Sequence, residues 1–155
     1  MIGLLLGIVA GAAFVGFNIY ERFKYERLNN ALKEQYKFVQ KVDSSKNAVF
    51  FNASMAGIAV ALGVVNVDDL NNIGISVALI SAFAGNILAA LNHRNVLFFE
   101  KGFSVDGVYT RYKSIQSLTS VKKGKQYKVL LLNQTSQMMD KNAVEVLNTL
   151  RNKKG

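Results

Sequence analysis

Three long stretches without a charged side chain constrain this chain more than any other feature of its sequence. They occupy residues 2–20, 48–66 and 73–91, and each is predominantly apolar. About 19 residues of helix span roughly 28 Å, because each residue advances a helix by about 1.5 Å, and this length matches the hydrocarbon core of a bilayer. The sequence therefore predicts an α-helical membrane protein with three transmembrane helices.

The distribution of basic side chains predicts the orientation of these helices. All 19 Lys and Arg lie either between Arg22 and Lys46 or after His93, whereas the connection between the second and third stretches carries only Asp68 and Asp69. Loops that face the cytoplasm are enriched in Lys and Arg. We therefore expect the N-terminus outside and the C-terminus inside.

A cleaved signal peptide and a buried helix of a soluble protein both fit the apolar stretches less well. A signal peptide carries basic residues before its apolar run, whereas residues 1–20 contain none and are followed at once by Glu21, Arg22 and Lys24. Buried helices of soluble proteins rarely reach this length without a charge. Both patterns favour helices that remain anchored in the membrane.

The positive charge of the chain predicts a lipid partner. A formal net charge of +9 would suggest nucleic-acid binding in a soluble protein. Here the basic residues lie on the side predicted to face the anionic cytoplasmic leaflet, where each close Lys or Arg contributes about 1 kcal/mol. We therefore expect anionic lipid, and no nucleic acid, as a partner. The residues expected at the headgroups are Arg22, Lys24, Arg27 and Arg94.

The chain is expected to divide after residue 92. Residues 1–92 form the predicted membrane domain, and residues 21–47 form a cytoplasmic helical connection inside it. The connection has helical periodicity, because a set of mostly apolar positions recurs every three or four residues. These positions are Leu28, Ala31, Leu32, Gln35, Tyr36, Val39 and Val42.

Residues 93–155 are predicted to form a small cytoplasmic α+β module. Runs rich in β-branched and aromatic residues alternate with turn signals such as Asp106-Gly107, which favours antiparallel strands. The expected strands are 96–99, 103–105, 108–112, 115–122 and 127–132. Asp140 can cap a C-terminal helix that closes this β-meander. The helix has an apolar stripe of Ala143, Val146, Leu147 and Leu150. About 60 residues are marginal as an independent fold, so we expect the module to pack against the 21–45 helix or the membrane surface.

Small residues and amides are the distinctive side chains within the predicted spans. Gly3, Gly7 and Gly11 form two successive G-x-x-x-G steps, a spacing that lets helix backbones approach closely in lipid. This helix-docking stripe has two interpretations: packing within the chain, or association with a partner or a second copy. The intramembrane amides are Asn18, Asn52 and Asn86. Asn52 and Asn86 are expected at similar depth, either as a cross-helix hydrogen bond or as a polar patch that meets a substrate or partner helix.

The sequence contains no recognisable catalytic constellation. Cysteine is absent, which excludes disulfides, thiolate metal sites and a cysteine nucleophile. His93 is the only histidine, and its place at the end of the third stretch predicts an interfacial anchor. We therefore expect no enzyme activity, no metal and no cofactor.

Short strings of the chain resemble the YobD-type family of uncharacterised three-span bacterial inner-membrane proteins. They are IYERF at 19–23, KGF at 101–103 and VYTRYKSI at 108–115. The tail is also similar to the β-plus-helix modules that follow membrane spans in bacterial PH-like proteins, although it is too short for a complete PH fold. The resemblance implies a bacterial cytoplasmic (inner) membrane location, no known catalysis, and in some genomes a neighbouring gene for a mannose-type phosphotransferase permease.

These observations lead to one principal functional hypothesis and two alternatives. The principal one is a non-enzymatic accessory or regulatory subunit that docks on a larger membrane protein such as a mannose-type sugar permease. The alternatives are a bacteriocin immunity protein that acts at such a permease, and a holin-like protein that assembles with its own copies into a homo-oligomer. A folded cytoplasmic tail would argue against the holin-like alternative.

Overall fold

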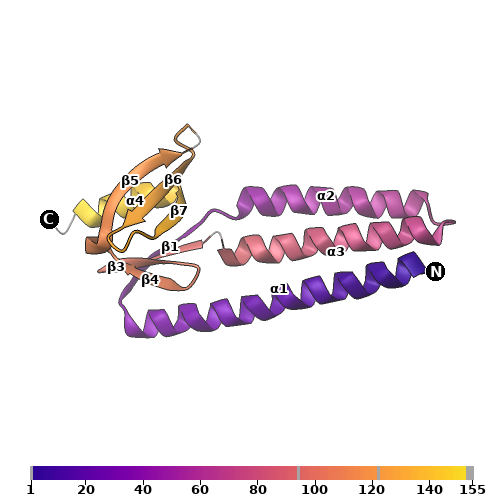
Figure 1. Cartoon of the computed structure of the whole chain (residues 1–155), viewed down its shortest axis with the longest axis horizontal. Coiled ribbons are helices and arrows are strands. Elements are labelled where there is room, and N and C mark those ends of the chain that lie inside the picture. Colours follow the sequence, from indigo (N-terminus) through magenta and orange to yellow (C-terminus); the bar gives the residue numbers. More distant parts are fainter. Residues whose placement is uncertain (1, 94, 122, 153–155) are drawn as a thin grey trace. The chain divides into compact units, whose positions relative to one another are not determined.

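Long helices and short strands form separate parts of the chain in the computed structural model, which describes residues 2–93, 95–121 and 123–152 (Figure 1). Residues 2–26 and 45–93 form one compact unit, which we call the helical unit. The described residues of 27–44 and 95–152 form a second, which we call the β unit. Each unit has its own set of buried side chains.

The helical unit contains the three predicted apolar stretches, and all three are helices. They are α1 (Ile2–Gln35), α2 (Lys46–Val65) and α3 (Leu70–His93). Each is long and apolar enough to cross a membrane. The last residues of α1 continue into the β unit. The prediction that the first helix runs on beyond its apolar stretch is therefore confirmed.

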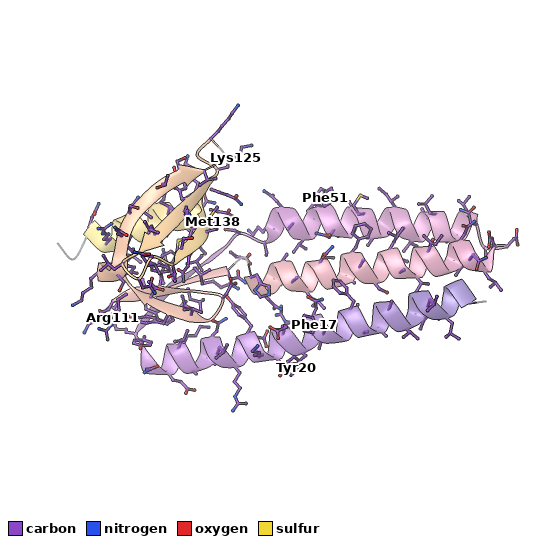
Figure 2. The ribbon with its side chains drawn as sticks, in the orientation of Figure 1. Phe17, Tyr20, Phe51, Arg111, Lys125 and Met138 are labelled. Atoms are coloured by element: carbon purple, nitrogen blue, oxygen red, sulfur yellow. The ribbon has the colours of Figure 1, made fainter. Side chains whose placement is uncertain are left out.

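The outer surface of the helical unit is apolar. Most large side chains of α1 and α2 are exposed, among them Leu5, Phe17, Phe51 and Val65, and α3 exposes Ile75. Figure 2 shows Phe51 projecting from α2. The few buried residues of α3 are instead small or polar, such as Gly74, Ser76 and Gly85. This distribution suits helices that are surrounded by hydrocarbon and contact one another through small residues.

The β unit contains two antiparallel sheets and a C-terminal helix. The four-stranded sheet has the order β1 (Phe38–Asp43), β2 (Asn95–Phe99), β3 (Gly102–Val105), β4 (Val108–Arg111). The three-stranded sheet has the order β5 (Ile115–Val121), β6 (Gln126–Leu131), β7 (Ser136–Asp140). A single 3-10 turn, Tyr112–Ser114, connects β4 to β5, and α4 (Lys141–Asn152) follows β7. The five predicted strands and the helix are confirmed.

Apolar side chains of both sheets and of α4 form the core of the β unit. Phe98, Phe103, Val129 and Leu147 are completely buried there. On α4, Ala143 and Leu147 are buried as the stripe predicts, and Val144 joins them. Val146 and Leu150 pack against this core and are partly buried.

The structure corrects the prediction that residues 21–47 form a continuous helical connection. The helix ends at Gln35, and Phe38–Asp43 form β1, which pairs with β2 from Phe38 opposite Phe99 to Asp43 opposite Asn95. A six-residue run is too short for periodicity to separate helix from strand, and the open edge of β2 stabilises the extended conformation. The chain also has a strand, β7, that the sequence did not predict. The tail is thus part of a two-sheet unit and not a simple meander.

Leu28 in the last part of α1 and Tyr36 just after its end lie against the four-stranded sheet. The Tyr36 ring lies 3.9 Å from that of Tyr109, measured between centroids, and 6.0 Å from that of Phe99. In the β3–β4 turn, a Cβ on Gly107 would lie 3.1 Å from the side chain of Leu28. The expectation that the module packs against the 21–45 helix is therefore confirmed for the part of this segment that is helical.

Candidate functional site

The glycine stripe of α1 faces α3 within the helical unit. A Cβ on Gly7 would meet the backbone carbonyl of Gly74, and one on Gly11 would meet the Ser81 hydroxyl. A Cβ on Gly3 would lie 2.9 Å from the Asn71 side-chain oxygen. This is the contact that the internal-packing interpretation expects. The stripe is therefore occupied within the chain.

The three amides predicted to lie within the membrane differ in burial and in hydrogen bonding. Asn18 is 6% exposed and donates to the carbonyl of Phe14 at 2.9 Å. Asn52 donates to the carbonyl of Ala48 at 2.8 Å, so it satisfies its amide within α2. Asn86 is exposed on α3 and forms no hydrogen bond with any described residue. The predicted cross-helix hydrogen bond between Asn52 and Asn86 is wrong. The Asn52 amide donates to the Ala48 carbonyl of its own helix instead, and Asn86 has no hydrogen-bond partner among the described residues.

The basic residues expected at lipid headgroups lie on α1 where its apolar stretch ends. Arg22 forms an ion pair with Glu26 at 2.9 Å, and Lys24 forms one with Glu21 at 3.4 Å. Arg27 is exposed and forms no ion pair with a described residue. Arg94, the fourth, lies outside the described residues.

The best candidate for a binding site is a groove of about 730 Å³ in the β unit. Basic and tyrosine side chains from several elements surround it. The lining residues are Tyr36, Lys101, Tyr109, Arg111, Tyr112, Lys113, Ile115 and Arg151. We call this site the cationic groove. Figure 2 labels Arg111, which is at the end of β4.

The tyrosines of the cationic groove are held by stacking and by a buried hydrogen bond. The rings of Tyr36 and Tyr109 are nearly parallel, with an angle of 6° between their planes. The Tyr112 hydroxyl donates to the carbonyl of Phe99 at 2.8 Å. Burial raises the pKa of Tyr112, and burial followed by the neighbouring Tyr36 raises the pKa of Tyr109. These phenols are therefore neutral at physiological pH.

Positive charge in the cationic groove is not neutralised by the described carboxylates. Lys101, Arg111, Lys113 and Arg151 are all exposed, and none forms an ion pair with a described residue. The nearest carboxylate in sequence, Glu100, is 3.2 Å from Lys37 instead. Among the described residues, no acidic side chain belongs to the lining. The groove can therefore attract an anion.

Sequence reasoning missed the cationic groove because its basic residues come from four separate segments: the β2–β3 turn, β4, the 3-10 turn and α4. No local motif links Lys101 to Arg151. In the described part of the chain, no cluster of three or more His, Asp or Glu is placed to hold a metal ion.

Comparison of the chain with protein-family models, with curated proteins and with solved structures gives no match. The resemblance to the YobD-type family therefore stays a sequence-based prediction.

Proposed function

We propose that this protein is a non-enzymatic accessory protein of the bacterial cytoplasmic membrane. The three long helices anchor it, with the N-terminus outside, and the β unit is a recognition module in the cytoplasm. The helices dock on a larger integral membrane protein, for which the family resemblance suggests a mannose-type phosphotransferase permease.

The pairing of β1 with β2 carries this proposal. β1 precedes α2 and β2 follows α3, yet the two strands are neighbours in one sheet. Residues on both sides of the α2–α3 hairpin must then be on the same side of any membrane, so α2 and α3 either both cross it or neither does. With three helices long enough to cross, α1 starts on the opposite side. The basic residues of the β unit favour the cytoplasm as the side of the sheet.

The strand order of the β unit supports a PH-like module. The described part of the β unit combines antiparallel strands with a C-terminal helix, as expected of the β-plus-helix modules that the tail resembles. Residues 93–155 alone are too short for such a fold. The segment before α2 adds β1 to the strands of these residues. A helical hairpin then occupies the β1–β2 connection of the module.

The exposed amide of Asn86 supports docking within the membrane. An amide surrounded by hydrocarbon has no hydrogen-bond partner, and a polar side chain on a neighbouring helix would supply one. The glycine stripe cannot serve in this way, because α3 already covers Gly7 and Gly11. The folded core of the β unit argues against a holin-like function.

Purification in gentle detergent tests the docking proposal. The wild-type chain should recover an integral membrane partner, and Asn86→Leu should reduce this recovery about tenfold if its hydrogen bond contributes about 1–2 kcal/mol. Asn52→Leu is the matched control, because Asn52 bonds only within α2, and recovery should persist. A cytoplasmic reporter fused to the C-terminus should be active in the same cells. Equal recovery with Asn86→Leu, or a silent reporter, would contradict the proposal.

A further inference from the structure

The cationic groove places around one cavity four basic side chains that form no ion pair with a described residue. Arg111 and Lys113 lie within three residues of one another, while Lys101 and Arg151 come from the β2–β3 turn and the last turn of α4. Cations that share a groove repel one another and raise the local concentration of anions. Two arginines among them offer planar, forked donors that match phosphate oxygens.

The size of the cationic groove exceeds that of a bare anion. Its volume of about 730 Å³ lies in the range of pockets that bury organic ligands. The stacked rings of Tyr36 and Tyr109, together with Ile115, add apolar surface beside the basic groups. Because the phenols of Tyr109 and Tyr112 stay protonated, they add no negative charge that would repel a phosphate.

We infer that the cationic groove binds a phosphate group carried on an organic ligand, with the phosphate at the basic side chains and the organic part against the tyrosines. Two sources share this chemistry: the headgroup of an anionic phospholipid, and a soluble phosphorylated metabolite. The inference relies on the proposed function only for the placement of the β unit in the cytoplasm. It does not depend on any membrane partner.

Calorimetric titration of the full chain in a neutral detergent tests the inference. The soluble probe is glycerol 3-phosphate, and the lipid probe is short-chain phosphatidylglycerol, with short-chain phosphatidylcholine as its zwitterionic counterpart. The double variant Arg111→Gln, Lys113→Gln removes two charges from the groove and should weaken binding about tenfold or more. Lys125→Gln, Lys128→Gln is the matched control, since both lysines are exposed and lie outside the lining. It should change the affinity less than about twofold.

Every outcome of this titration decides the inference. Binding of glycerol 3-phosphate alone assigns a soluble ligand, binding of phosphatidylglycerol alone assigns a lipid, and binding of both is ranked by affinity. Each supports the site if only the groove variant weakens it. The inference is overturned if neither glycerol 3-phosphate nor phosphatidylglycerol binds, if phosphatidylcholine binds as tightly as phosphatidylglycerol, or if both double variants weaken binding equally. If the first variant misfolds by near-ultraviolet circular dichroism, Arg151→Gln at the end of α4 replaces it and should weaken binding several-fold.

Failure of the inference and failure of the proposed function give different results. Partner recovery is measured from membranes and depends on Asn86, whereas titration uses purified protein and depends on Arg111 and Lys113. Loss of partner recovery would leave ligand binding unchanged, and loss of ligand binding would leave partner recovery unchanged.

Discussion

Phe51 on α2 and Phe98 on β2 are the same amino acid in opposite surroundings. Phe51 is 61% exposed in the helical unit, whereas Phe98 is completely buried in the β unit. The residues at the internal contacts of the two units also differ: they are small between the helices and large between the sheets. α1 meets α3 through glycine and serine, and the two sheets of the β unit meet through phenylalanine, leucine and valine. Water drives large apolar side chains inward. Lipid, the surroundings proposed for the helical unit, removes that force and leaves close backbone approach to select the interface.

Replacement of Phe98 by Ala is the largest test of this contrast. It removes a fully buried ring from the core of the β unit, so the free energy of unfolding of that unit should fall by about 3–5 kcal/mol. Limited proteolysis should then cleave within residues 95–152, while the helices stay in the membrane fraction. Phe51→Ala is the matched control and should change stability by less than about 0.5 kcal/mol. A comparable loss in both variants would mean that Phe51 is buried against another protein.

Replacement of Gly7 by Leu should have the next largest effect. The new side chain would meet the backbone of Gly74, and overpacking of this kind costs about 1–3 kcal/mol. Since the chain has no cysteine, the α1–α3 contact can be followed by disulfide formation between Ala10→Cys and Ala78→Cys, two positions that line one groove. Gly7→Leu should suppress that cross-link.

The control for this experiment is Gly57→Leu on α2. A Cβ at Gly57 has no neighbouring atom within 4 Å, so the cross-link should persist. Loss of the cross-link in both variants would show that added bulk disturbs insertion in general, and not the α1–α3 contact.

Tyr112→Phe should produce the smallest loss. The change removes the hydrogen bond to the carbonyl of Phe99 but keeps the ring, so the β unit should lose about 1 kcal/mol in a chemical denaturation experiment.

The same variant should alter the pH dependence of stability. Burial raises the pKa of Tyr112 above the value of 10.0 that applies in the unfolded chain. Above pH 10 the unfolded state releases this proton before the folded state does, so stability is fully present below pH 10 and falls as the pH rises further. Tyr112→Phe should make that alkaline decline shallower. An unchanged slope would assign the decline to other groups.

Helices and strands could be predicted where the residues that determine them are neighbours in the sequence. Charge-free runs located α1, α2 and α3, and alternation with Asp106-Gly107 located the hairpin of β3 and β4. β1 was missed because its stabilising neighbour, β2, lies beyond two long helices. β7 was missed because Ser136–Asp140 has weak strand propensity and becomes a strand through its pairing with β6.

The site residues were harder to predict, for a related reason. The small-residue spacing identified a contact surface on α1, but only the fold could show that Gly7 lies against Gly74 and not against another protein. For Asn86, spacing suggested a partner at equal depth in α2, yet Asn52 bonds to its own helix. The cationic groove depends on residues as distant as Lys101 and Arg151, and no pattern along the chain brings these together.

The shared sheet of β1 and β2 also has a consequence for quality control in the cell. If only one of α2 and α3 entered the bilayer, β1 and β2 would be separated by the membrane and the four-stranded sheet could not close. β2, whose residues Asn95–Phe99 are all buried in the native sheet, would then present an unpaired apolar edge. Such an edge invites aggregation and cleavage by proteases that survey unfolded segments. If the protein spans a membrane as proposed, correct insertion of the hairpin is thus a condition for closing the four-stranded sheet.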